Sequence, residues 1–128
     1  MAKSDYLEQI ILNQVLRGVA YSQPSAVYLA LFTVAEDDTG GAGTEVAGGG
    51  YTRQTITFSA PVANEASNSA DVLFPVATAD WGEVLHFGIF DAAVAGNLLY
   101  HAPLTASRTI LTGDQLRFPA GQLVVGEQ

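Results

Sequence analysis

Short apolar stretches recur along this chain at intervals of about ten residues, and glycine, proline or asparagine separates each from the next. Such regular breaks are typical of chains that fold into many short antiparallel strands. We see neither an alternation of strands with helices nor a repeat of fixed period. The pattern predicts a mainly β fold, an antiparallel β-sandwich resembling a jelly roll, in a single domain over residues 1–128. The expected strands are 26–33, 51–59, 70–74, 83–90, 97–103, 107–112, 115–119 and 122–125.

The start of the chain departs from this pattern and predicts a short α-helix within residues 1–20. Ser4 or Asp5 can cap its first turn, and Gly18 can end it. Apolar residues repeat between these caps at helical spacing and form a stripe. A helix of this length is marginal alone in water, so the stripe docks either on its own domain or on a neighbouring subunit. The interface residues that the stripe predicts are Leu7, Ile10 and Ile11.

Residues 34–50 are rich in glycine, acidic, and almost free of large apolar side chains. The composition predicts a long, mobile loop, and loops of this length commonly carry an interaction. Its run of three acidic residues resembles a calcium loop faintly, but the alternating ligand spacing of such loops is absent. We therefore expect no metal here and predict contact with another subunit. The residues concerned are Glu36, Asp37 and Asp38.

Both histidines lie in one predicted hairpin, and its register decides whether they can meet. If Phe90 faces Leu98, then His86 faces Ala102 and the two rings lie on opposite sides of the sheet. A slip of one residue would place His86 opposite His101. Zinc would still need a third ligand, and a general base would need a nucleophile or a bound substrate beside it. We expect neither catalysis nor metal nor any cofactor at either ring.

The single tryptophan, Trp81, opens the same hairpin. A tryptophan at the start of a strand is most often an anchor in the core or at an edge. The alternative is a stacking platform for a sugar or a receptor, in which Tyr51 is a second candidate. We include Trp81 among the interface residues. Gly88, in the middle of its strand, marks a bulge or a close approach of backbone.

Charge and composition restrict the partners of the chain. The net charge is −8, and its five basic residues do not cluster, so a face for nucleic acid or for an anionic membrane is not expected. Charged residues make up 14% of the chain, against roughly 25% in average domains, which suggests a surface covered partly by copies of itself. The chain has no cysteine, no signal peptide is apparent, and synthesis in a reducing cytoplasm is expected.

Motifs of enzyme sites are missing from the sequence. There is no Gly-x-Ser-x-Gly elbow, and the triple glycine at 48–50 precedes a strand rather than a helix. A polysaccharide hydrolase would need a spaced pair of carboxylates. Its candidates would be Asp71, Asp80, Glu83 and Asp91, and no spacing favours a pair. We predict that the protein is not an enzyme.

Several sequence blocks resemble a family of small virion proteins of tailed bacteriophages, often labelled tail fibre proteins. The most specific are "GGGYTR" at 48–53 and "WGEVLHFGIFD" at 81–91; the N-terminal "MAKSDYLEQIILNQVLRG" and "GNLLYHAPLTASRTILTGDQLRFPAGQL" extend the resemblance over nearly the whole chain. The resemblance implies a structural protein of the virion, assembled in the cytoplasm of the host bacterium. It brings no known catalytic residues with it.

The chain lacks the length of a fibre, since it has no coiled coil and no repeated shaft unit. In size and acidity it is more similar to the decoration (cement) proteins of phage heads, which are commonly jelly rolls or β-barrels and often trimers. This similarity implies a homotrimer that binds the major capsid protein and stabilises the assembled shell by mass action. The alternative is a tail fibre or baseplate component involved in host attachment.

Overall fold

The computed structural model describes residues 2–126; residues 1, 127 and 128, which the predicted domain includes, lie outside this part. The fold is mainly β, with one N-terminal helix, as predicted. The bounds of the elements are β1 Ala2–Lys3, α1 Asp5–Arg17, β2 Val27–Val34, β3 Thr44–Glu45, β4 Gln54–Ile56, β5 Glu65–Ser67, β6 Val72–Leu73, β7 Gly82–Phe90, β8 Leu98–Ile110, β9 Arg117–Phe118 and β10 Val124–Gly126.

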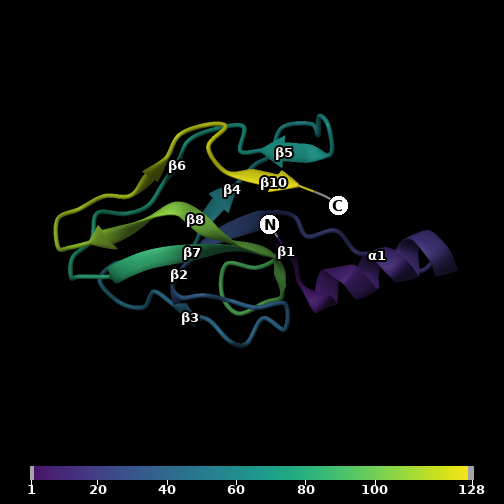
Figure 1. Ribbon diagram of the computed structural model, residues 1–128, viewed down its shortest axis with the longest axis horizontal. Helices are drawn as coiled ribbons and strands as arrows, with labels where there is room; N and C mark the ends of the chain where they lie inside the picture. The colour runs from purple at the N-terminus through teal and green to yellow at the C-terminus, as the bar shows by residue number, and fades with distance from the viewer. Residues whose placement is uncertain (1, 127–128) are drawn as a thin grey trace.

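The strands form one main sheet and a second, divided layer. The main sheet is antiparallel with the order β1-β8-β7-β2-β3, and β4 also pairs with β2. Two separate antiparallel pairs, β5 with β10 and β6 with β9, lie over one face of it (Figure 1). The predicted antiparallel sandwich is thus present, but its second layer is not the continuous sheet of a jelly roll.

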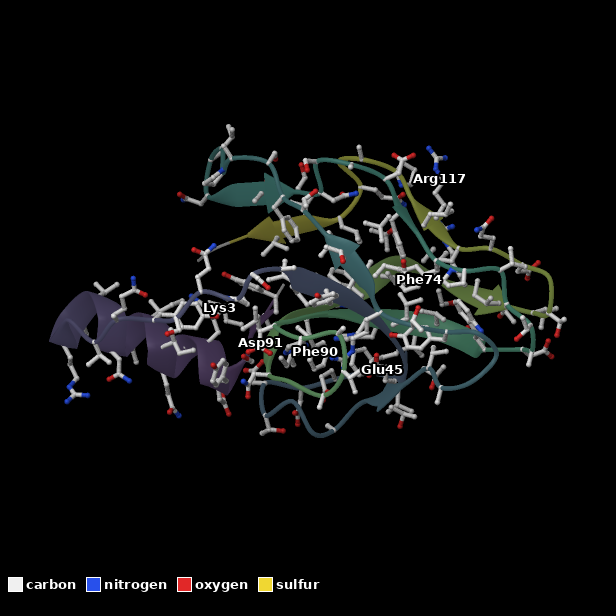
Figure 2. All side chains as sticks on the ribbon, turned by 180° about the vertical axis from the view of Figure 1, so that it is seen from behind. Lys3, Glu45, Phe74, Phe90, Asp91 and Arg117 are labelled. Atoms are coloured by element: carbon white, nitrogen blue, oxygen red, sulfur yellow. The ribbon has the colours of Figure 1, made fainter. Side chains whose placement is uncertain are left out.

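The larger core fills the space between the main sheet and the two small sheets. Phe74 is fully buried there and packs edge-on against Trp81 and Phe118. A smaller cluster lies on the opposite face of the main sheet and is covered by loops. Figure 2 shows Phe74 on one side of the sheet, and Phe90 and Glu45 on the other. The small cluster consists of Ala30, Phe32, Phe90 and Leu98.

β8 is one long strand where the sequence predicts two, at 97–103 and 107–112. Proline has no N–H to donate to a neighbouring strand, yet Pro103 does not end β8. β1 pairs with β8 only at Tyr100 and His101, so at Pro103 only β7 lies beside β8. The predicted turn at Gly113 is present, with φ of 91°. The prediction of a hairpin around this turn is wrong, since β9 pairs with β6 rather than with β8.

α1 begins and ends where the sequence predicts. The Ser4 hydroxyl accepts the N–H of Leu7 at 3.2 Å and donates to the carbonyl of Leu98. Gly18 ends the helix in the left-handed region, with φ of 68°. Beyond its first turn the helix projects away from the β-body (Figure 1). Within residues 2–126, no helix has the length and apolar character needed to cross a membrane.

Candidate functional site

The two histidines meet on one face of the main sheet. In the pairing of β7 with β8, Gly88 lies opposite His101 and His86 lies opposite Pro103. His86 and Gly88 are two residues apart on one strand, so the side chains of His86 and His101 project on the same side. His86 Nε2 lies 3.1 Å from His101 Nδ1, and the ring centroids are 5.3 Å apart.

Neither of the two registers expected from the sequence is correct for the histidines. Phe90 does face Leu98, but the register shifts between Ile89 and Phe90. This bulge moves the preceding part of the hairpin by one residue and makes the histidines diagonal neighbours. Gly88, beside them, is a close approach: a Cβ there would lie 2.9 Å from Leu98 Cδ1.

The histidine pair continues into the loop that follows β2. His101 Nε2 lies 2.8 Å from Asp38 Oδ1. The backbone carbonyl of Asp38 accepts the N–H of Asp5, the first residue of α1, at 2.8 Å. We call His86, His101 and Asp38 the histidine chain. It connects the sheet to the loop on which the first turn of α1 is fixed.

The protons of the histidine chain follow from its partners. His101 donates from Nε2 to the Asp38 carboxylate, and its bare Nδ1 accepts from His86 Nε2. A further proton on His86 Nδ1 fits this arrangement. A second one, on His101 Nδ1, would place two N–H groups face to face between the rings. Both rings are buried, with 6% and 8% of their surface exposed. Burial, together with the neighbouring His101, lowers the pKa of His86, and Glu36 opposes this shift.

The acidic run at 36–38 does not converge on a cation. Glu36 turns inward, Asp37 accepts from the backbone and hydroxyl of Thr39, and Asp38 accepts from His101. The Thr39 hydrogen bonds lower the pKa of Asp37. Asp38 does bring its carboxylate within 4.8 Å of those of Asp5 and Glu8, all three exposed. This surface group includes neither histidine.

The predicted loop at 34–50 is tied to the β-body by one buried glutamate and by β3. Glu36 is 7% exposed. Its Oε1 accepts the backbone N–H groups of Asp37, Ala42 and Gly43 at 3.0, 2.8 and 2.8 Å. Gly43 lies so close to Phe32 that a Cβ would be 2.9 Å from that ring. Glu36 therefore shapes the cover of the small cluster, whereas Asp37 and Asp38 are exposed.

Arg53 holds a second loop over the same face. Its guanidinium forms two hydrogen bonds with Glu45, both at 2.9 Å, and donates to the carbonyls of Ala92 and Ala95. It also lies 3.8 Å from the ring centroid of Phe90. The Arg53 side chain is 8% exposed. Sequence reasoning missed this role, although the "GGGYTR" block carries the residue.

Trp81 is a buried core residue, and the partly buried Tyr51 packs against the core beside it. Trp81 is 6% exposed, and its Nε1–H donates to the carbonyl of Gly49 at 2.9 Å. Tyr51 packs edge-on against it at 5.5 Å between ring centroids and donates its hydroxyl proton to Glu45 at 2.6 Å. Burial, followed by this bond to Glu45, raises the pKa of Tyr51. The anchor interpretation of Trp81 fits this geometry.

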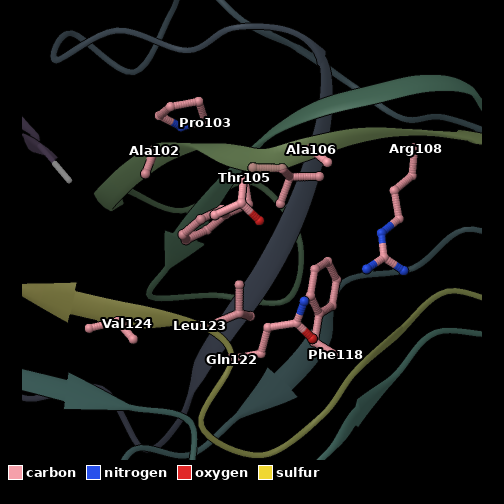
Figure 3. A pocket seen from close by; sticks show the side chains of 11 residues that line it. Ala102, Pro103, Thr105, Ala106, Arg108, Phe118, Gln122, Leu123 and Val124 are labelled. Carbon is pink, nitrogen blue, oxygen red and sulfur yellow. The ribbon is translucent and has the colours of Figure 1, made fainter.

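A surface pocket of about 250 Å³ lies between β8 and the turn before β10 (Figure 3). Phe87 and Phe118 contribute apolar lining, and Arg108 and Gln122 contribute polar groups. Within the described residues, the guanidinium of Arg108 makes no ion pair, in contrast to those of Arg53 and Arg117. The pocket therefore has a cation at its edge that is not neutralised by a carboxylate of the described residues.

Some apolar residues of α1 pack against the chain's own β-body, and others are exposed to solvent. Leu7 is buried, while Ile10 and Ile11 are half-buried. Leu12 is 56% exposed, and Val15 and Leu16 are each 73% exposed. The predicted interface residues thus lie at the base of the helix, and the more open face lies further along it.

The fold therefore presents a compact β-body with a projecting apolar helix and with histidines that organise a loop, which is the design of a structural module. Comparison with known families agrees with this class. Residues 2–126 match the family model described as Podophage GP4 fiber I protein gp80, and the chain belongs to this family. It is accordingly a structural component of a phage virion. No curated protein matches the chain.

Proposed function

We propose that this protein is a non-enzymatic structural subunit of a tail fibre and that α1 joins its β-body to the rest of the assembly. The observation that carries the proposal is the open apolar face of the projecting helix. Leu12, Val15 and Leu16 are more than half exposed and add nothing to the chain's own core. A helix of 13 residues is marginal alone, so a covering subunit would stabilise it.

The family name supports a fibre over a capsid decoration. The β-body is too compact to form a shaft by itself, so its role is that of a module within a larger fibre. This module is rigid because both faces of its main sheet are covered. The ring contacts of Phe74 hold one face, and the Arg53–Glu45 ion pair holds the other. A rigid module that binds its neighbours through one helix can be added to a fibre in the same position each time.

The carboxylates that a hydrolase would use have structural partners instead. Glu83 accepts from Ser107, Asp80 accepts from the backbone and hydroxyl of Thr112, Asp91 accepts from Asn97, and Asp71 pairs with Arg117. Each fixes a turn or an edge of the sheet. The histidine chain is also buried and fixes a loop. These bonds support a structural role over a catalytic one.

A capsid decoration protein is the second candidate. It is favoured by the compact form and the low share of charged residues, 14% of the chain. In that case a homotrimer would bind the major capsid protein, and the copies would number in the hundreds per particle. A fibre subunit, with or without direct contact to the host, would be present in far fewer copies.

Antibody labelling of purified virions separates the two candidates. A fibre subunit places the label at the tail, and its band is weak relative to that of the major capsid protein. Label over the whole head with a strong band would reject the fibre proposal and favour decoration. Virions grown with Leu16→Lys should lose the band, whereas Leu73→Lys, at an exposed leucine on the β-body, should retain it.

A further inference from the structure

We propose that the pocket beside β8 binds a small sugar acid, a ligand that carries one carboxylate and several hydroxyl groups. The pocket lies between β8 and the turn before β10 and has a volume of about 250 Å³. Ligand pockets commonly span about 300–1,000 Å³, so this one has room for a single small unit. The site is separate from α1, and the proposal does not depend on the role given to that helix.

A bulge in β8 opens the pocket. Residues 104–107 of β8 stand opposite the single residue Leu85 of β7, where the register of the two strands shifts. A bulge of this kind bends the strand that carries the extra residues. Among the described residues, no strand other than β7 pairs with this part of β8, so the pocket stays open to a ligand. The bulge residues that line it are Leu104, Thr105 and Ala106.

The opposite wall of the pocket is a turn that one buried amide holds in place. Asn68 is 2% exposed. Its Nδ2 donates to the carbonyl of Pro119 at 3.0 Å, and its Oδ1 accepts the N–H of Leu123 at 2.9 Å. Gln122 lies between these two anchored positions, and its own N–H donates to the Pro119 carbonyl at 3.1 Å. The wall is therefore ordered before a ligand arrives, which lowers the entropic cost of binding.

Three polar side chains line the pocket and bind nothing else. Within residues 2–126, the side chains of Thr105, Arg108 and Gln122 take part in no hydrogen bond or ion pair. Val84, which pairs with Arg108, is buried in the larger core, so Arg108 leaves the sheet on the side of that core. Figure 3 shows its guanidinium reaching toward the wall that carries Gln122. The chain has a net charge of −8, yet this cation is left to an external anion.

These groups define the chemistry of the ligand. The Arg108 guanidinium matches a carboxylate, while the Thr105 hydroxyl and the Gln122 amide each donate and accept, as the hydroxyl groups of a ligand do. Phe87 and Phe118 make the lining between them apolar, and the C–H face of a sugar ring can pack on such a surface. A sugar acid combines all three features, whereas a simple anion would use only the guanidinium.

NMR titration of the isotope-labelled full chain with sodium glucuronate, at constant ionic strength, tests the site. We expect saturable shifts of the amide signals of residues 104–108 and 120–124, with a dissociation constant on the order of 1 mM. Glucose lacks the carboxylate and acetate lacks the hydroxyl groups, so each should bind about tenfold more weakly or worse. Methyl glucuronide distinguishes the source of the ligand. If it binds like glucuronate, the ligand is a unit within a polysaccharide; if it does not bind, the ligand is a free sugar acid.

Arg108→Gln removes the cation at an exposed position and should weaken glucuronate binding about tenfold. Arg17→Gln removes the same charge from the exposed surface of α1 and is the control, with unchanged binding expected. The amide spectrum of each variant also shows whether it is folded.

Acetate binding as tight as that of glucuronate would reduce the site to a simple anion contact and overturn the sugar acid. Equal binding of glucose, equal binding by Arg108→Gln, or the lack of a saturable shift with glucuronate would also overturn the proposal. None of these results bears on the location of the protein in the virion, which the labelling experiment reports. The two proposals therefore fail separately.

Discussion

His86 Nε2 lies 3.1 Å from His101 Nδ1, although the two residues are not partners in the pairing of β7 with β8. A bulge at Ile89 and the missing side chain of Gly88 bring the rings together diagonally across the strands. Asp38 then extends the contact to the loop under α1. His86 is therefore a buried titratable group, and its protonation affects the stability of the fold.

Acidification should destabilise the protein before its carboxylates titrate. The pKa of His86 in the folded chain is below its ordinary value of 6.5, so the unfolded chain binds this proton first as the pH falls. The free energy of unfolding should therefore decline as the pH drops below about 6.5 and level off below the folded pKa. Urea unfolding between about pH 8 and about pH 5 measures this.

His86→Gln removes the titrating group and is the matched variant for the pH series. Its free energy of unfolding should be lower at neutral pH, since it disturbs a buried bond, but flatter across the same range. If the two proteins show the same slope with pH, His86 is not the source of the dependence.

Gly88→Ala should cost about 1–3 kcal/mol of stability. The new Cβ would lie 2.9 Å from Leu98 Cδ1 and 3.1 Å from atoms of Phe32 and Phe90, all within the small buried cluster. Gly41→Ala is the control, because its Cβ would meet nothing closer than 3.8 Å. Equal melting temperatures for the two variants would contradict the packing described for this face.

Arg53→Gln should destabilise the chain by about 3 kcal/mol, because it leaves Glu45 without its partly buried partner and uncovers Phe90. Arg117→Gln makes the same change at an ion pair in which both side chains are about half exposed. That variant should cost no more than about 1 kcal/mol. Denaturant unfolding of both reports the difference, and a similar loss in both would contradict the role given to Arg53.

Ser4→Ala should release the base of α1 from the sheet. The hydroxyl caps the helix at Leu7 and donates to the carbonyl of Leu98, so its loss should cost about 1–2 kcal/mol and part of the helical circular dichroism signal. Ser25→Ala, at an exposed serine, should change neither. Full helicity in Ser4→Ala would mean that the β1 pairing alone fixes the helix.

The sequence was sufficient for the parts of the fold that depend on local signals. The caps at Ser4 and Gly18 and the strands near 26–33 and 83–90 follow from propensity and periodicity. The strand at 51–59 shortened to Gln54–Ile56. β1, β3 and β5 were not expected, because their two or three residues include no large apolar side chain. Their existence depends on partners distant in the chain.

The site was harder to predict because each of its contacts depends on a long-range event. The histidines meet through a one-residue bulge, and Asp38 reaches His101 from 63 positions away. Glu36, Asp37 and Asp38 look alike in sequence, yet one faces the interior, one bonds its own turn, and one binds a histidine. In a strand over 51–59, the period of two places Tyr51 and Arg53 on one face, but their common partner Glu45 is not apparent from the sequence.

The two faces of the main sheet are closed by different means, and this should give the molecule two rates of opening. One face is sealed by paired strands and a continuous apolar core, whereas the other is sealed by loops pinned at Glu36 and Arg53. Backbone amides of Ala42 and Gly43 should then exchange with deuterium through local fluctuations. Those of Leu29 and Ile89 should exchange only through global unfolding. A virion built from such a subunit could loosen one side of it and keep the other intact.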